Sequence, residues 1–104
     1  MESYNVCITE PAESDLRDIA RYISSQLNAP KAALNTIRAI NDAITKLETN
    51  ALIYPLVRDD YLASLGYRLL VVKNYIVFYV VNEKEKSVDV DRILCSRRDW
   101  QNIL

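Results

Sequence analysis

The sequence contains no histidine and only one glycine among its 104 residues. The missing histidine excludes a His-based catalytic triad, a histidine metal site and acid–base catalysis by imidazole. A single glycine excludes the glycine-rich loops that hold phosphates or dinucleotides. Cys7 and Cys95 are too few ligands for a structural zinc site. We therefore expect neither a metal nor a cofactor.

Long apolar runs and a strong charge excess are also missing. The apolar runs are no longer than a strand, so we expect no membrane contact. The formal net charge is −1, whereas proteins that bind through phosphate contacts usually carry a clear positive excess. Two distant cysteines without a secretory segment predict reduced, buried thiols in a cytoplasmic protein. The length fits one domain, residues 1–104.

The first half of the chain predicts a strand followed by two helices. Residues 4–9 alternate and are rich in strand formers. An amphipathic helix is expected from Pro11 to Leu27 and a second over residues 30–49. Asn28 and Pro30 separate them, since asparagine tolerates a left-handed cap and proline suits a first helical position. The expected buried stripes are Ala12, Leu16, Ile19, Ala20, Ile23 and Leu27, then Ala33, Ile37, Ile40, Ile44 and Leu47.

The second half predicts three strands, over residues 66–72, 75–82 and 87–95. Residues 50–65 are the least regular and read as a loop with room for a short strand. The last residues, 97–104, are expected to form a short closing helix. The order β-α-α-β-β-β predicts an α+β fold with a two-helix hairpin on one face of an antiparallel sheet.

Arg68 is the one charge inside the first predicted hairpin. A two-residue turn at Lys73 and Asn74 pairs Arg68 with Tyr79, and leaves Tyr75 on the same face. The opposite face is more uniformly apolar and is therefore expected to pack on the helices; it carries Tyr67, Leu69, Val71, Ile76, Phe78 and Val80. Arg68, Tyr75 and Tyr79 would then form an open recognition surface. In the alternative, Arg68 only pairs with Asp89 or Asp91.

The ordered set of segments resembles the RelE/ParE superfamily of toxins from bacterial type II toxin–antitoxin systems. The resemblance covers almost the whole chain. It includes the strand at 4–9, both helices, Pro55, Gly66-Tyr67-Arg68, Asn74 to Tyr79 and the ending from Asp91 to Asp99. It implies the same β-α-α-β-β-β fold.

The resemblance implies a toxin that a cognate antitoxin neutralises, and two possible targets. Some members are ribosome-dependent endonucleases that cut mRNA, whereas the ParE branch, associated with plasmid stabilisation, inhibits DNA gyrase by binding. A third hypothesis is a non-toxic domain that binds a peptide. A homodimer stays open as well.

The residues favour the ParE branch over the nuclease branch. A nuclease would use Arg68, Arg98 and Tyr67, but Asp59 and Asp60 stand where nucleases show lysines, and would repel an RNA backbone. The ending from Arg92 to Asp99 is closer to the ParE pattern, with Cys95 in place of the usual histidine. A toxin that works by binding needs no acid–base pair.

The remaining polar and aromatic residues receive simpler interpretations. Arg92 is expected in an ion pair with Asp89 or Asp91. Glu10, Glu13, Asp15 and Asp18 are expected on a solvated helix face. Tyr4, Tyr22, Cys7 and Cys95 are expected in the core, and Trp100, Ile103 and Leu104 packed against the domain. The predicted partner-binding residues are Arg68, Tyr75, Tyr79, Arg97, Arg98 and Trp100.

Overall fold

Four strands form one mixed sheet in the order β1-β4-β3-β2 in the computed structural model, which describes residues 3–97, 100, 103 and 104. The strands are β1 (Asn5–Ile8), β2 (Tyr67–Val72), β3 (Tyr75–Asn82) and β4 (Ser87–Cys95). The three predicted C-terminal strands are confirmed. The sheet is not antiparallel throughout, because β1 and β4 run parallel. Two parallel strands cannot be joined by a tight turn and need a long crossover connection. Here the connection from β1 to β4 starts with the helices that follow β1.

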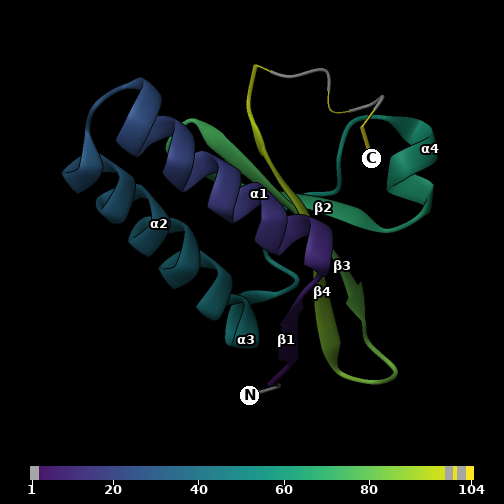
Figure 1. Ribbon diagram of the computed structural model, residues 1–104. Helices are drawn as coiled ribbons and strands as arrows, with labels where there is room; N and C mark the ends of the chain where they lie inside the picture. Colours follow the sequence, from purple (N-terminus) through teal and green to yellow (C-terminus); the bar gives the residue numbers. More distant parts are fainter. Residues whose placement is uncertain (1–2, 98–99, 101–102) are drawn as a thin grey trace.

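Two long helices follow β1 and form the predicted hairpin (Figure 1). They are α1 (Glu10–Arg21), extended by a π-helical turn η1 (Tyr22–Gln26), and α2 (Pro30–Thr45), followed by the short α3 (Leu47–Asn50). Thr9 caps α1 by accepting a hydrogen bond from the Ala12 amide at 3.3 Å. Asn28 adopts the expected left-handed conformation, with φ of 49°.

A further helix, α4 (Asp60–Ser64), lies in the stretch predicted as a loop. Asp59 caps it, since its Oδ1 accepts a hydrogen bond from the Leu62 amide at 2.9 Å. Before it, the Val57 amide donates to the Tyr67 carbonyl at 3.0 Å, so residues around 56 extend the edge of β2. The prediction of a loop missed a helix of five residues, which is too short to show a helical period.

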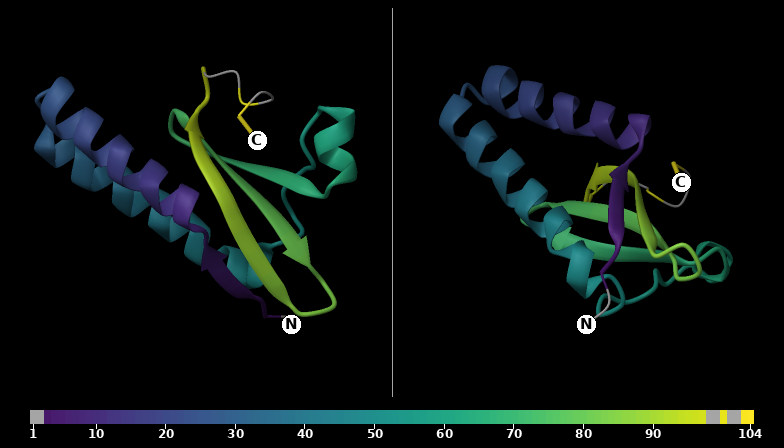
Figure 2. Two further views of the ribbon diagram at one scale, coloured as in Figure 1. Left: turned by 45° about the vertical axis from the view of Figure 1, so that its right-hand side comes forward. Right: turned by 90° about the horizontal axis from the view of Figure 1, so that it is seen from below.

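Both faces of the sheet are covered, as Figure 2 shows. The α1–α2 hairpin covers one face and encloses the larger core, which includes Tyr79, Val77, Val90 and Ile40. On the other face α4 and the C-terminal residues enclose a second, smaller core. Its buried members are Val57, Leu62, Ile76, Phe78 and Leu94, and its partly buried members include Tyr67, Leu69, Trp100, Ile103 and Leu104.

The predicted strand register is confirmed, but the predicted assignment of faces is wrong. Arg68 pairs with Tyr79 and Val72 with Tyr75. Tyr75 and Tyr79, however, lie on the helix-covered side, while Tyr67 and Phe78 lie on the other. A more uniformly apolar face did not identify the helix side, because short segments far along the chain also cover the second face. Within the described part of the chain, Arg68, Tyr75 and Tyr79 therefore form no open recognition face.

A β-bulge in β4 adds a further shift. Phe78 pairs with Arg92 and Tyr79 with Val90, so Asp91 is the extra residue between them. An extra residue reverses the alternation of side chains along a strand. Val88 and Val90 face the larger core before the bulge, and Ile93 faces it afterwards. The bulge thereby keeps β4 apolar toward the helices along its whole length.

Several single-residue predictions can be compared with the observed burial. Tyr4 is buried as expected, at 4% exposure. Tyr22 is 53% exposed and Cys7 lies at the surface of β1, so their predicted core positions are wrong. Cys95 is half-buried. None of the described helices has the length and apolar character that crossing a bilayer requires.

The predicted closing helix over residues 97–104 falls partly on residues 98–99 and 101–102, which lie outside the described residues. The described part of the tail packs as expected. The Trp100 ring lies against Phe78 with ring centroids 5.1 Å apart. Ile103 and Leu104 pack against the same second core.

Candidate functional site

Arg68 and Tyr79 anchor the segment after α3 to the helix-covered face of the sheet. The Arg68 guanidinium donates to the Tyr54 carbonyl at 2.6 Å. The Tyr79 hydroxyl donates to the Ala51 carbonyl at 2.8 Å, and its side chain is fully buried. Burial raises the pKa of Tyr79 to about 12, against a smaller lowering by Arg68. The Arg68 guanidinium and the Tyr79 hydroxyl therefore both have hydrogen-bond partners within the chain. Arg68 pairs with neither Asp89 nor Asp91.

Tyr67 lies on the opposite face of the same strand. Its hydroxyl donates to Asp91 Oδ2 at 2.7 Å. Burial and then the hydrogen bond to Asp91 raise the pKa of Tyr67 to about 12. The phenol is thus held neutral at physiological pH, and it points away from Arg68 because neighbouring strand residues alternate in direction.

The three residues of the hypothetical nuclease site do not come together in the described structure. Tyr67 and Arg68 serve different cores on different faces. Arg98, the third residue, lies outside the described residues. A phosphate bound at one of the two faces could not be reached from the other.

Asp15 joins α1 to β4 through an ion pair and three hydrogen bonds. Its carboxylate accepts from Arg92 Nε at 2.8 Å and from Arg92 Nη2 at 2.9 Å. It also accepts from the Ile93 amide at 2.9 Å. These bonds replace a strand partner, since β1 pairs only as far as Val90 and leaves the next residues of β4 at an edge.

The expected ion pair of Arg92 is confirmed, but its partner was wrongly predicted. Asp15 is 9% exposed, so its predicted place on the solvated helix face is wrong. Its spacing could have revealed this, because position 15 lies three residues after buried Ala12 and four before buried Ile19. The hydrogen bond to Asp15 raises the pKa of Arg92. Arg92 is therefore a permanent cation bound inside the fold.

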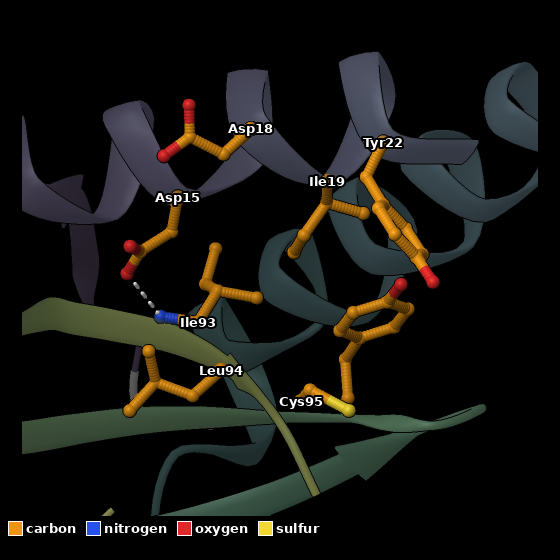
Figure 3. Close-up of a pocket in the computed structure, with 8 residues that line it drawn as sticks. Asp15, Asp18, Ile19, Tyr22, Ile93, Leu94 and Cys95 are labelled. Carbon is orange, nitrogen blue, oxygen red and sulfur yellow. Dashed lines mark hydrogen bonds between the residues drawn. The ribbon is translucent and has the colours of Figure 1, made fainter. Parts of the chain in front are cut away.

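A cavity of about 320 Å³ opens beside this ion pair, between α1–η1 and the end of β4 (Figure 3). α1 and η1 contribute Asp15, Asp18, Ile19 and Tyr22. The strands contribute Tyr75, Ile93, Leu94 and Cys95. The cavity contains one predicted partner-binding residue, Tyr75. Sequence reasoning missed the others, because the cavity forms only where the helix crosses a strand more than 70 residues away, as the Asp15–Arg92 separation of 77 shows.

Apart from Arg98, which lies outside the described residues, the other predicted partner-binding residues are spread over the molecule. Arg97 is exposed just after β4, and Trp100 packs on Phe78. Tyr79 is sealed within the larger core. The structure thus does not gather the predicted set into one patch. Among the described residues, no group of three or more potential ligands could hold a metal ion.

Comparison with protein families decides the classification. The family described as "ParE toxin of type II toxin-antitoxin system, parDE" matches residues 6–100, which is nearly the whole chain. The chain belongs to the ParE toxin family. It is accordingly a type II toxin of the ParE/RelE superfamily, as the ordered segments of the sequence predicted.

Solved structures share the fold of this ParE-family chain at low sequence identity. A protein of the "Chromosomal ParDE TA system from P. aeruginosa" is 20% identical, with a TM-score of 0.73 over 89% of this chain and 96% of that chain. A chain of "the toxin-antitoxin complex RelBE2 (Rv2865-2866) from Mycobacterium tuberculosis" is 19% identical. Its TM-score is 0.65 over 89% of this chain and 98% of that chain. No curated protein matches the sequence significantly.

Proposed function

We propose that this ParE-family toxin inhibits DNA gyrase by binding it, and that a cognate antitoxin holds the toxin inactive. Gyrase is the target that the resemblance to the ParE branch implies. The antitoxin is suggested by the toxin–antitoxin systems to which the similar structures belong. The alternative target is mRNA on the ribosome.

One observation carries the preference for binding over cleavage. RNA cleavage needs a base, an acid and a cation around one phosphate. Here Tyr67 and Arg68 point to opposite faces, and each is already bonded within the chain. A neutral phenol whose pKa is raised to about 12 is also a poor base at neutral pH.

The charge near β2 supports the same preference. Asp59 and Asp60 open α4, directly before the strand that carries Arg68. Asp59 is committed to the helix cap, and Asp60 is exposed. Carboxylates at this position repel the backbone of RNA, whereas a protein target tolerates either sign of charge.

The test compares the two targets with one protein preparation. We expect purified wild-type chain to inhibit supercoiling by gyrase and to leave ribosome-bound mRNA intact. In bacteria, induction should cause DNA breaks and filamentation before translation falls. Cleavage of mRNA on the ribosome with unaffected gyrase would overturn the proposal.

The antitoxin is tested separately. We expect the small protein encoded next to this chain to bind it and to restore growth when both are expressed. Growth arrest that this neighbour does not relieve would contradict the antitoxin part of the proposal alone.

A further inference from the structure

The cavity between α1–η1 and the end of β4 has two chemically different ends. Figure 3 shows Asp15 and Asp18 at one end, and Tyr22 and Cys95 at the other. Ile19 and Ile93 lie between them and make the middle apolar. A ligand that fills the cavity must therefore be apolar along its length and polar at its tip.

Only one of the two carboxylates is available to such a ligand. Asp15 is occupied by Arg92 and by the Ile93 amide. Among the described residues, Asp18 forms an ion pair only with Arg21, at 3.5 Å, and the two side chains are 68% and 73% exposed. Exposed pairs of this kind contribute little, so Asp18 keeps most of its attraction for another cation.

The phenols at the other end add hydrogen-bonding groups and aromatic faces. Tyr22 is 53% exposed although it stands beside the cavity. It opens the π-helical turn η1, whose Leu27 amide bonds to the Tyr22 carbonyl at 3.1 Å. Such turns recur at functional sites. Burial raises the pKa of Tyr75, with smaller effects of the nearby Cys95 and Tyr22, so the phenol is neutral and able to donate.

At the end of β4 next to these phenols, some backbone amides point away from β3, beyond the edge of the sheet. The Ile93 amide points out of the sheet toward Asp15, and the Ser96 amide points inward to the Asn74 carbonyl at 2.8 Å. By alternation, the Cys95 amide points outward as well. An approaching peptide backbone would therefore meet main-chain groups at this end of the cavity.

We propose that this cavity receives one lysine or arginine side chain of the antitoxin. The methylene stem lies along Ile19 and Ile93, and the cationic head reaches Asp18. The antitoxin backbone passes Tyr22 and the outer edge of Cys95. An acidic side chain would be repelled by Asp18, and a purely apolar one would leave the carboxylate end unused. The choice of the antitoxin as the partner rests on the proposed function.

The first experiment tests the chemistry of the cavity without any antitoxin. N-acetyl-arginine amide is titrated into the ¹⁵N-labelled chain, and N-acetyl-citrulline amide serves as its neutral isostere. We expect saturable shifts of the Asp18, Tyr22 and Cys95 amides with arginine and much weaker binding of citrulline. Asp18→Asn should weaken arginine binding about fivefold, the effect of losing one partly screened charge.

Two variants control for general changes of charge. Glu13→Gln removes an exposed carboxylate from the same helix outside the cavity, and should leave the affinity unchanged within about twofold. Arg21→Gln removes the competing cation of Asp18 and should strengthen binding about twofold. Equal binding of arginine and citrulline, or equal effects of Asp18→Asn and Glu13→Gln, would overturn the proposal.

The second experiment uses the complex with the protein encoded next to this chain. Asp18→Lys with Tyr22→Ala should weaken the complex at least about tenfold, and Glu13→Lys with Tyr61→Ala should leave it unchanged. Tyr61 is the matched control because it is 70% exposed on α4, away from the cavity.

The two possible failures give different results. A wild-type complex that both double variants leave intact would overturn the cavity proposal and leave the proposed function standing. Loss of growth inhibition with an unchanged complex would assign the cavity to the target instead, which also overturns it. If the neighbour does not neutralise the wild-type chain, the antitoxin part of the proposed function fails.

Discussion

The two faces of the sheet are covered by different kinds of structure. The α1–α2 hairpin, with helices of 12 and 16 residues, covers one face. The five-residue α4, the segment around Val57 and the C-terminal residues cover the other. Consecutive residues of β3, Phe78 and Tyr79, thus belong to different cores, both fully buried. On the hairpin side two long helices pack against the sheet. This side should therefore contribute more to the free energy of unfolding than the side covered by short segments.

The largest expected effect is on the hairpin side. Tyr79→Ala should lower the free energy of unfolding by about 4 kcal/mol, because it empties a fully buried site and removes the bond to Ala51. Chemical denaturation followed by circular dichroism measures the loss. A loss below that of Trp100→Ala on the other side would contradict the comparison.

The contact between the hairpin and β4 comes next. Asp15→Asn should cost about 3 kcal/mol, since it leaves Arg92 without its charged partner. Asp18→Asn, one turn away on the same helix, should change stability by less than about 0.5 kcal/mol because its ion pair is exposed. Similar losses in the two variants would show that the Asp15 contact carries no special weight.

High pH should weaken both sides, but through different tyrosines. Tyr67 and Tyr79 have pKa values raised to about 12 from 10.0. The folded state therefore favours the neutral phenols, and stability that is full below pH 10 is lost as the pH rises toward 12. Tyr79→Phe should flatten this fall, by about 2 kcal/mol over the interval. If the free energy of unfolding of Tyr79→Phe falls as steeply with pH as that of the wild type, the loss comes from groups other than Tyr79.

A smaller loss is expected on the second face. Trp100→Ala removes the ring that packs on Phe78 and should cost about 1–2 kcal/mol. Denaturation of this variant is followed by circular dichroism. Trp100 is the single tryptophan, so the variant has no tryptophan fluorescence to follow. A loss as large as that of Tyr79→Ala would mean that the tail is as important as the hairpin.

The smallest expected effect tests how far along β2 the second core extends. Val71 lies on β2 beyond the residues that pair with the segment around Val57, and is 58% exposed. Val71→Lys should change the free energy of unfolding by less than about 0.5 kcal/mol. A larger loss would indicate that the second core extends to this end of the strand.

The sequence predicted the elements of the fold better than their contacts. The bounds of the three C-terminal strands, the hairpin at Lys73 and the left-handed Asn28 follow from local patterns, and each is confirmed. The side on which each strand face packs does not follow from such patterns, because both faces of β2 and β3 are apolar. The parallel pairing of β1 with β4 likewise depends on the path of the whole chain.

The candidate site was less predictable than the fold. Tyr75 was named from its place in the hairpin, and it does line the cavity. Asp18 and Tyr22 are ordinary helix residues in the sequence, and their role depends on how α1 crosses β4. The bond between Asp15 and Arg92 spans 77 residues. The only local indication of this contact is that Asp15 lies at helical spacing from the buried residues Ala12 and Ile19.

The pairing of the first strand with the last also has a consequence for synthesis. The Thr9 hydroxyl donates to the Asp91 carbonyl across 82 residues, so this edge cannot close until residue 91 has left the ribosome. Contacts between distant segments are slow to form. A nascent copy should consequently lack this edge of the sheet, and the contacts that depend on it, until its fourth strand has been synthesised.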